Sequence, residues 1–445
     1  MHTVVIGNAR ILTLGGKPGP RRGADLADLG VIEHGWVRFS DDTIDSVGHG
    51  DPEGIDDEEG DFVDAGGSVL MPAFVDCHTH ACWAGNRFDE FESSLRGASY
   101  LEILAAGGGI MSTVRAVRDA TEDGLIAMLL RRTAGMAALG TGTVEVKSGY
   151  GLDTETELKM LRSIHAVSQL VPQMMIGTFL GAHAIDPDRP KFIDETIRET
   201  LPAVVQEFPE ITCDAYCEKG AWSLADTERL FRAAHDLGCP LRLHADQFTS
   251  LGATRLAIEM GAMSVDHLEA TTPGDLRQLA DSSTFGVALP CSGFHLDDRY
   301  APARAFVDAG GALAIATNYN PGSAPTPSMP FTIALACRKL GLTPAEAIAA
   351  ATYNAAWVLG LQDRIGSIEP GKRADLQLLD AADERELGFE LATAGPLLVV
   401  LGGQLAHARA IEREEDDEFD EYEMEMEFED EDEEEDEDED EDGDE

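Results

Sequence analysis

The chain has 445 residues, 43% of them hydrophobic, and a formal net charge of −50. This length and apolar content allow a large buried core, and so negative a charge argues against nucleic acid as a partner. The sequence contains no run of 18 apolar residues and no secretory signal pattern, so we expect neither a membrane partner nor export. Seven scattered cysteines without a CxxC pair indicate free thiols in a cytoplasmic protein.

The negative charge is divided between a terminal tail and the body of the chain. Residues 412–445 contain 27 acidic residues and one arginine, so this segment carries −26 and the rest carries −24. Charge repulsion and few apolar side chains predict that 412–445 is disordered, with a solubility role favoured over binding of a cationic partner. Only 7 of the 33 basic residues are lysine, and an acid-rich, lysine-poor body suits concentrated salt, so we hypothesise a halophilic source.

Residues 1–68 predict the amino-terminal part of a small β domain. Short apolar segments alternate there with Gly, Asp and Pro, and an acidic loop lies at residues 51–61. The strands expected in this part are Val4–Ile6, Arg10–Leu14, Trp36–Phe39 and Thr43–Val47.

Residues 69–360 change to strands that alternate with helices. Eight such units predict an α/β fold, a (β/α)8 barrel of the TIM type, and the lack of GxGxxG after the first strand weakens a doubly wound alternative. The expected strands are Val69–Asp76, Thr143–Lys147, Met175–Phe179, Thr212–Tyr216, Leu241–Leu243, Met263–Val265, Phe285–Leu289 and Leu313–Ala316, with helices that include Glu122–Leu139, Thr154–Gln169, Ser223–Leu237 and Ala253–Met260.

The last helix of this series should begin at Thr343, which is followed by Pro344 and by Glu346 three residues on, and should end near Leu359. Residues 361–411 then predict the carboxy-terminal part of the small β domain, which both ends of the chain would build together. The strands expected here are Ala374–Leu379, Pro396–Leu401 and Gln404–Arg409.

Histidines gather at the carboxyl ends of the expected barrel strands, where such a barrel keeps its active site. Five of the twelve histidines lie at these ends: His78, His80, His183, His244 and His267. If 69–76 is one buried strand, His78 and His80 point in the same direction. A pair of turn histidines is the alternative for that segment alone, but the clustering favours a metal site.

The residue types suit hydrolysis that depends on a metal ion. Neutral imidazoles bind zinc or a similar ion, and three of them leave one position for water, whose pKa the ion lowers. His267 is a candidate for proton transfer, with a structural core histidine as the alternative. Arg87 is a candidate clamp for a substrate carboxylate, with a surface ion pair to Glu90 or Glu92 as the alternative.

The stretch Pro72-x-Phe74-Val75-Asp76-x-His78-Thr79-His80 resembles the signature of the amidohydrolase superfamily, metal-dependent hydrolases on a (β/α)8 barrel with a split β domain. More narrowly, residues 1–410 resemble the imidazolonepropionase family. The segments that carry this narrower resemblance are Gly107–Ile110, Glu145–Leu152, Thr178–His183 and Asn320–Gly322.

The resemblance implies hydrolysis of the ring C–N bond of 4-imidazolone-5-propanoate to N-formimidoyl-L-glutamate, with one divalent or trivalent metal ion, zinc ahead of iron. By position it implies His78, His80, His244 and the residue at Asn318 as the metal site, and His267 with Gln247 as catalytic residues. It also implies a small-molecule substrate, and it leaves a homodimer open. The implied substrate-binding residues are Arg87, Tyr150, His183, Gln247, Asn320, Gly322 and Ser323.

Two positions depart from the pattern that this resemblance implies. Asn318 stands where an aspartate ligand is expected, and a neutral amide is a weaker ligand that cannot take a proton from water. Gln247 stands where some relatives have Glu; it can bind a ring atom but cannot act as an acid. Two alternatives therefore stay open: a deaminase or amidase acting on another cyclic amidine or imide, and a catalytically impaired homologue. Lys147 is expected in a structural or substrate-proximal ion pair, with a metal-bridging carbamate as the lesser alternative.

Overall fold

The computed structural model describes residues 2–52, 61–98, 102, 107–392 and 395–409. These residues belong to one compact unit, Met1–Arg409, that contains two eight-stranded sheets. The predicted disordered tail and most of the acidic loop at 51–61 lie outside the described residues. Among the residues that are described, no helix has both the length and the apolar content that crossing a bilayer requires.

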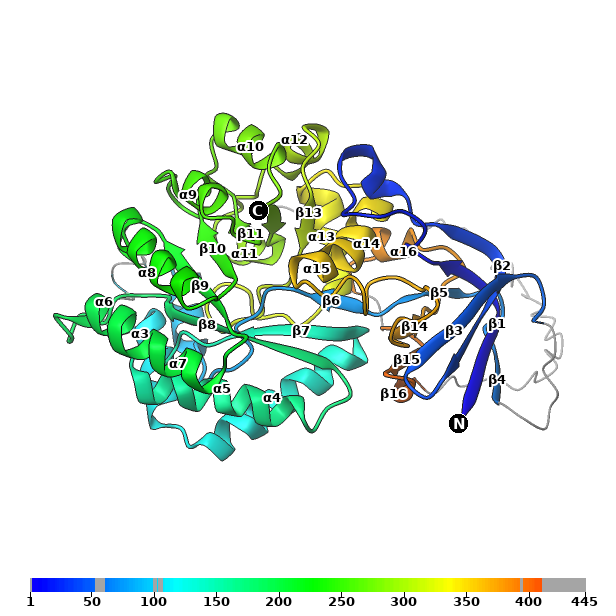
Figure 1. Cartoon of the computed structure of the whole chain (residues 1–445), viewed down its shortest axis with the longest axis horizontal. Helices are drawn as coiled ribbons and strands as arrows, with labels where there is room; N and C mark the ends of the chain where they lie inside the picture. The colour runs from blue at the N-terminus through cyan, green and yellow to red at the C-terminus, as the bar shows by residue number, and fades with distance from the viewer. Residues whose placement is uncertain (1, 53–60, 99–101, 103–106, 393–394, 410–445) are drawn as a thin grey trace, which may run out of the picture. The chain divides into compact units, whose positions relative to one another are not determined.

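The first sheet is a barrel of eight parallel strands in sequence order, with helices outside it (Figure 1). This arrangement confirms the predicted (β/α)8 fold class. The strands are β6 (Phe74–Asp76), β7 (Thr141–Lys147), β8 (Met174–Ala182), β9 (Thr212–Cys217), β10 (Leu241–Ala245), β11 (Ser264–His267), β12 (Phe285–Ala288) and β13 (Leu313–Ile315).

The helices around and after the barrel begin at residues that favour helix starts. Several have a Ser, Thr or Asp whose side chain accepts a hydrogen bond from a backbone N–H three residues on, and Thr343 forms a full capping box with Glu346. The helices are α1 (Phe88–Leu95), α3 (Ile110–Asp119), α4 (Glu122–Ala138), α5 (Thr154–Ser168), α6 (Phe192–Glu195), η2 (Thr196–Thr200), α7 (Leu201–Glu207), α8 (Leu224–Asp236), α9 (Ala253–Glu259), α10 (Pro273–Ala280), α11 (Pro290–Leu296), α12 (Ala303–Asp308), α13 (Met329–Lys339), α14 (Pro344–Ala351), α15 (Tyr353–Val358) and α16 (Glu386–Phe389).

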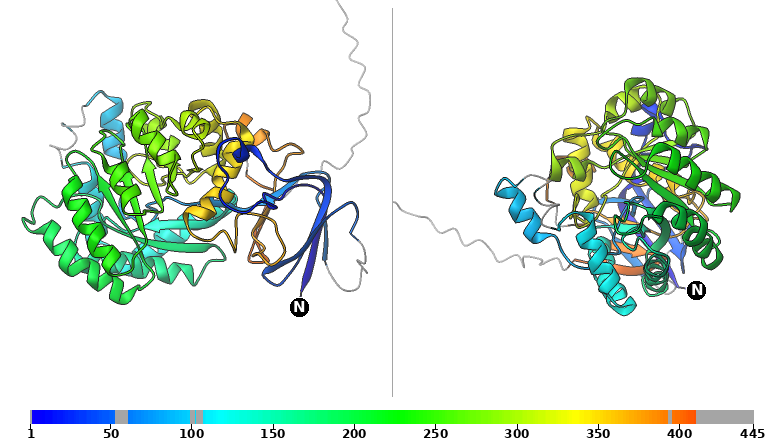
Figure 2. Two further views of the ribbon diagram at one scale, coloured as in Figure 1. Left: turned by 45° about the horizontal axis from the view of Figure 1, so that its top comes forward. Right: turned by 90° about the vertical axis from the view of Figure 1, so that its left-hand side faces the viewer.

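The second sheet combines both ends of the compact unit, as the sequence predicts. The left view of Figure 2 shows its amino-terminal strands in blue beside the orange carboxy-terminal segment. Its strand order is β16-β15-β14-β5-β1-β2-β3, with β4 paired to β1. The bounds are β1 (Thr3–Leu12), β2 (Val31–Ser40), β3 (Thr43–His49), β4 (Asp61–Asp64), β5 (Val69–Pro72), β14 (Leu376–Leu378), β15 (Leu398–Leu401) and β16 (Gln404–Ala408), and a short 3-10 helix, η1 (Gly23–Ala27), follows β1.

Two predicted elements are divided in the structure. The single strand expected at 69–76 is wrong: β5 pairs with β1 and β14 in the second sheet, whereas β6 starts the barrel. The chain changes sheets at Ala73, whose N–H donates to the Asp375 carbonyl, while the next N–H, of Phe74, donates to Gly140. The helix expected from 343 to 359 is likewise interrupted at Thr352, where φ is −130°, between α14 and α15.

The barrel closes through residues just beyond its first and last strands. Thr79 forms an isolated parallel bridge with Tyr319, and the Tyr319 carbonyl accepts a 3.0 Å hydrogen bond from the His80 N–H. On the other side of this bridge the Asn318 N–H donates to the His78 carbonyl at 3.0 Å. The hydrogen bonds that close the barrel therefore place His78 and His80, two of the predicted metal ligands, directly beside Asn318.

Candidate metal centre and active site

His78, His80 and His244 converge at the carboxyl end of the barrel. One ring nitrogen from each lies within 4.8 Å of the others, and all three residues are buried. The His78 ring centroid is 4.4 Å from that of His244 and 5.4 Å from that of His80. Burial lowers the pKa of each of the three imidazoles below its usual 6.5, which favours the neutral form that binds metal ions.

Buried carboxylates fix which nitrogen of two of these histidines faces the centre. Nδ1 of His78 lies 2.6 Å from Asp266 Oδ2, and Nδ1 of His244 lies 3.1 Å from Asp214 Oδ1. Each Nδ1–H therefore donates to a carboxylate and leaves Nε2 as the basic nitrogen, the arrangement usual for metal-binding histidines. Nε2 of His78 is buried without a partner in the described part of the chain.

The spacing of these nitrogens fits one ion. Nε2 of His244 lies 3.4 Å from Nε2 of His80. Two nitrogen ligands of a tetrahedral zinc, each about 2.0–2.1 Å from the ion, stand about 3.3 Å apart. The unpartnered Nε2 of His78 completes a set of three buried nitrogen donors. The residues present therefore fit a divalent metal ion of the borderline-soft type.

Asn318 presents an amide to the same region. Its Nδ2 donates to Ser292 Oγ at 2.7 Å, and its Oδ1 is buried and has no partner among the described residues. Its backbone has a φ of +55°, a left-handed conformation that asparagine tolerates better than most residues. With the amide nitrogen on Ser292, the oxygen is the atom of the amide that is left free. A ligand role for Asn318 stays a prediction that this free oxygen supports.

A network of buried ion pairs lies behind the histidines. Lys147 Nζ is 2.6 Å from Glu145 and 2.8 Å from Asp214, and Arg242 is 2.7 Å from Asp266 and 3.4 Å from Glu145. Because the Lys147 ammonium donates to two carboxylates, the observed contacts match the expected ion pair. The two carboxylates that orient His78 and His244 are thus held by one connected network.

We expect Lys147→Met to destabilise the fold by about 3–5 kcal/mol, since removing one partner leaves buried carboxylates uncompensated. Urea unfolding in excess chelator measures this without a contribution from metal binding. The matched control is Lys219→Met, because Lys219 is exposed and its loss should change the unfolding free energy by no more than about 0.5 kcal/mol. Equal stability of the two variants would mean that the network contributes nothing to folding.

Aromatic side chains border the histidine cluster on one side. The His183 ring stacks on His80 with centroids 4.7 Å apart, and the Tyr150 ring lies 5.2 Å from His183 and 6.0 Å from His80. His183 Nδ1 is 3.2 Å from the Gly149 carbonyl, and burial together with His244 lowers the pKa of His183 to about 3. A neutral His183 with its Nδ1–H on that carbonyl can offer Nε2 to a ring N–H of a ligand.

Arg87 precedes α1 and lies against the loop that follows β13. Its Nη2 pairs with Glu90 Oε2 at 2.5 Å, and Glu90 also accepts a 3.0 Å hydrogen bond from the Gly109 N–H. The ion pair considered as an alternative is therefore present. A Cβ placed on Gly322 would lie 2.8 Å from Nη1, so the guanidinium also faces this loop, and its Nε has no partner within the described residues. The pair with Glu90 thus leaves other donors of Arg87 for a ligand.

The loop residues Asn320, Gly322 and Ser323 lie beside Arg87, but their polar groups serve the loop itself. Oδ1 of Asn320 accepts from the N–H groups of Gly322 and Ser323 at 2.8 Å each. Its Nδ2 donates to the Asn318 carbonyl at 2.6 Å and to Ser323 Oγ at 2.9 Å. The Asn320 side chain therefore fixes the loop that faces Arg87 and holds Asn318 in place.

His267 is the last residue of β11, and Gln247 lies two residues after the end of the neighbouring strand β10. The His267 ring lies 5.6 Å from that of His244 and 6.0 Å from that of His78, close to the cluster but outside the three nitrogens that converge. Gln247 Oε1 accepts a 2.8 Å hydrogen bond from the Tyr216 hydroxyl. The structure thus brings every predicted site residue to one end of the barrel, although their roles stay predictions.

Several polar residues of this region were not predicted from the sequence. Most of them are ionisable side chains within or just after barrel strands, and Ser292 lies in the helix that follows β12. Ionisable residues at positions expected to be buried were the available signal. These residues are Glu145, Asp214, Arg242, Asp266, Glu269 and Ser292.

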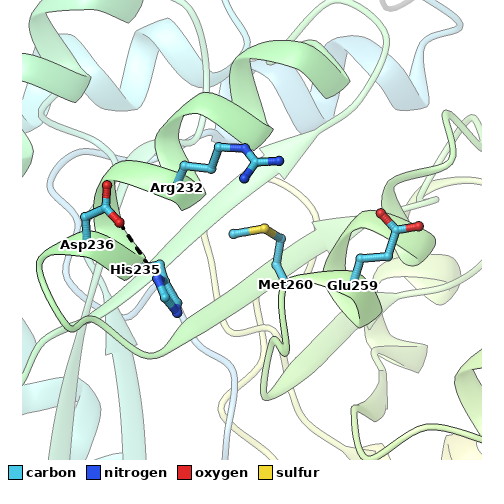
Figure 3. Close-up of a pocket in the computed structure, with 5 residues that line it drawn as sticks. All are labelled: Arg232, His235, Asp236, Glu259 and Met260. Carbon is cyan, nitrogen blue, oxygen red and sulfur yellow. Dashed lines mark ion pairs between the residues drawn. The ribbon is translucent and has the colours of Figure 1, made fainter.

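A hollow lies at the other end of the barrel, where α8 and α9 end (Figure 3). Helices that follow parallel strands end at the amino-terminal side of the barrel, which is associated with stability and not with catalysis. None of the predicted site residues lines this hollow. Two of its lining residues, His235 and Asp236, contact each other at the surface at 4.0 Å. Its lining residues are Arg232, His235, Asp236, Glu259 and Met260.

Comparison with known proteins agrees with this geometry. The model of the amidohydrolase family matches residues 69–406. The chain belongs to this family. An imidazolonepropionase from Herpetosiphon aurantiacus is 44% identical over 411 residues, which cover 90% of this chain and 96% of the relative. An imidazolonepropionase from Rubrobacter xylanophilus is 43% identical over 87% of this chain and 94% of its own. Within the amidohydrolases the chain is therefore a member of the imidazolonepropionase family.

Two solved structures share the fold at low sequence identity. The triazine hydrolase from Arthobacter aurescens superposes with a TM-score of 0.70 at 15% identity, covering 91% of this chain and 94% of that one. The guanine deaminase of E. coli superposes with a TM-score of 0.68 at 14% identity, covering 92% of this chain and all of its own. At such identities the likeness establishes the architecture alone.

Proposed function

We propose that this amidohydrolase adds water to the ring carbonyl of 4-imidazolone-5-propanoate and opens the ring to N-formimidoyl-L-glutamate. The observation that carries the proposal is the set of three converging histidine nitrogens, with a partly unpaired arginine against the loop that follows β13 at the same end of the barrel. A metal-binding centre next to a cationic group suits a substrate with a reactive ring and a carboxylate tail. The relatives that are 41–44% identical over most of the chain support the same reaction.

In this mechanism His78, His80 and His244 would hold the ion, and Asn318, whose backbone N–H donates to the His78 carbonyl, would offer its free oxygen as a further ligand. When bound, the ion activates water and polarises a carbonyl. The tautomers set by Asp266 and Asp214 keep the two Nε2 atoms available, and the ion pairs behind them keep the rings in place. The chain thus presents a centre that needs little rearrangement on binding its ion.

The remaining residues bind the substrate and move protons. Arg87 would bind the propionate, with Tyr150 and His183 against the ring. His267 would take a proton from the water as its oxygen bonds to the ring carbon, and would return a proton to the ring nitrogen as the C–N bond breaks. Gln247, fixed by the Tyr216 hydroxyl, would hydrogen-bond the ring without donating a proton to it.

The test is turnover of freshly prepared imidazolonepropionate by the metal-loaded protein, followed by loss of the substrate's ring absorbance and detection of formimidoylglutamate. Substrate consumption that requires the metal supports the proposal. Turnover of guanine or hydantoin in its place would support a different cyclic amide or amidine as substrate. Metal-free, inactive protein would favour the catalytically impaired homologue, for which Asn318 is the supporting observation.

Asn318→Asp should retain or increase the activity, because it places a carboxylate where the neutral amide oxygen lies. We expect the affinity for the metal to rise by about 10-fold or more, the scale on which groups near a metal site change that affinity. Competition with a fluorescent chelator measures that affinity, and steady-state kinetics measure turnover. Asn318→Ala is the matched control and should weaken binding. A large loss of activity in Asn318→Asp would show that the amide serves a different mechanism.

The proposal includes zinc, ahead of iron, as the resident ion, which elemental analysis of protein purified without added metal tests. We also propose that the protein is cytoplasmic and that its source is halophilic. Neither nucleic acid nor a membrane is a proposed partner. A homodimer is left open, and light scattering in low and high salt decides it. Increasing stability with salt would support the halophilic part, since salt screens the repulsion within a chain of charge −50.

A further inference from the structure

Glu269 lies two residues after His267 and faces its ring. Oε1 of Glu269 is 3.3 Å from Nδ1 of His267, and both side chains are buried, with exposed fractions of 5% and 4%. The other carboxylate oxygen, Oε2, is buried and has no partner among the described residues. A carboxylate withdrawn from water with one unpaired oxygen is unfavourable for folding, so its presence at a reactive centre calls for a functional reason.

The backbone between the two residues brings this contact about. His267 has a φ of +91° and Leu268 a φ of +77°, both in a region that residues other than glycine seldom adopt. Two consecutive residues of this kind turn the chain at the end of β11, so that the Glu269 side chain returns to the His267 ring. Such strained residues persist only where the surroundings hold them, and they concentrate at functional sites.

Glu269 differs from the two other carboxylates that contact site histidines. Asp266 is paired with Arg242 at 2.7 Å and Asp214 with Lys147 at 2.8 Å, so their charges are largely balanced by buried cations. The contact of Glu269 with His267 is its one described ion pair, and its second oxygen is free. The Arg299 guanidinium also interacts electrostatically with Glu269, but its own described ion pair is with Asp297. His267 is therefore the residue with which Glu269 itself forms an ion pair.

Glu269 also borders the side of the site where Gln247 lies. A small hollow is lined by Glu269 together with Gln247 and Ser292, the residue that holds the Asn318 amide. Asp297 and Arg299 line the same hollow and pair with each other at 2.9 Å. The hollow thus contains a second carboxylate, Asp297, whose charge is already paired with an arginine.

We propose that Glu269 is the positioning residue for His267, accepting the hydrogen bond from Nδ1–H and leaving Nε2 as the atom that exchanges protons with water and substrate. The inference rests on the proposed function for the identity of the step, but the contact itself can be tested without turnover. The carboxylate holds the ring in one orientation and one tautomer. It also stabilises the positive charge that His267 carries after Nε2 accepts the proton, and that charge disappears when the proton passes to the ring nitrogen.

The first test measures kinetics in a double-mutant cycle. Glu269→Gln should lower kcat by about 10–100-fold with KM changed less than about twofold and metal content unchanged, the usual scale for an oriented histidine that loses its partner. In a His267→Ala background the same change should have no further effect, because the group through which Glu269 acts is gone. Asp297→Asn is the matched control and should leave kcat within about twofold. Equal factors in both backgrounds, or loss of metal in Glu269→Gln, would overturn the proposal.

The second test examines the contact between Glu269 and His267 without requiring turnover. In zinc-loaded protein with ¹⁵N-labelled histidine, the ring signals of His267 are assigned by their loss in His267→Ala. We expect the proton on Nδ1, and a proton on Nε2 would overturn the assignment of Glu269 as its acceptor. If the wild-type protein does not turn over imidazolonepropionate, the proposed function fails while this measurement still decides the role of Glu269.

Discussion

His244→Ala is expected to purify without its metal ion and without activity. His244 supplies one of the three converging nitrogens, and the 3.4 Å separation of its Nε2 from that of His80 fits a shared ion. Removal of an outer partner of a ligand already costs about 10–100-fold in metal affinity, so removal of the ligand should cost at least about 100-fold. Elemental analysis of the purified variant and chelator competition measure the metal content and the affinity.

His235→Ala is the matched control for this prediction. The His235 side chain is 71% exposed and pairs only loosely with Asp236 at the opposite end of the barrel, so its loss should leave the metal content unchanged. Chelator treatment provides a second readout. A ligand present at about 1,000 times its Kd stabilises a fold by about 4 kcal/mol, so metal removal should lower the Tm of wild type and of His235→Ala but not that of His244→Ala. A His244→Ala protein that keeps one ion with unchanged affinity would move the metal site elsewhere.

The barrel could be predicted from the sequence because its strands and helices alternate along the chain with different periodicities. Each of the last seven expected strands overlaps an observed one, and β7 begins only two residues before its expected start at Thr143. The prediction of a single first strand was wrong because nothing in an apolar run around Pro72 indicates a change of sheet. That change depends on hydrogen bonds from Ala73 and Phe74 to Asp375 and Gly140, which are distant in sequence. Local pattern predicts elements well, whereas partners distant in sequence decide which sheet a strand joins.

The histidine cluster was likewise predictable, because residues just after parallel strands meet at one end of a barrel. The buried network behind it was not. Lys147 contacts Asp214, 67 residues away, and Arg242 contacts Asp266, 24 residues away, and no spacing rule links such pairs. The contact of Glu269 with His267 is local, but it depends on two left-handed residues that the sequence Asp-His-Leu-Glu does not reveal. The polar residues that contact the reactive groups could therefore be identified only from the three-dimensional arrangement.

His267→Ala is expected to lower kcat by about 10²–10⁴-fold, the usual contribution of a positioned acid–base group, while the protein keeps its metal. The His267 ring centroid is 5.6 Å from His244 and 6.0 Å from His78, and the residue is not one of the three whose nitrogens converge within 4.8 Å. Its loss should therefore remove proton transfer and leave the donor set of the ion intact. Steady-state kinetics and elemental analysis of the same preparation measure the two effects separately.

Small imidazole added to His267→Ala gives the sharper readout, because the substitution leaves a space beside Glu269 that a free imidazole can fill. We expect turnover to rise with imidazole concentration in His267→Ala, and to rise less in His267→Ala with Glu269→Gln, where the carboxylate that would hold the added ring is absent. The metal content of both variants should stay the same when imidazole is added. If His267→Ala instead loses the ion, His267 is a ligand, and proton transfer must be assigned to another group that faces the three histidines.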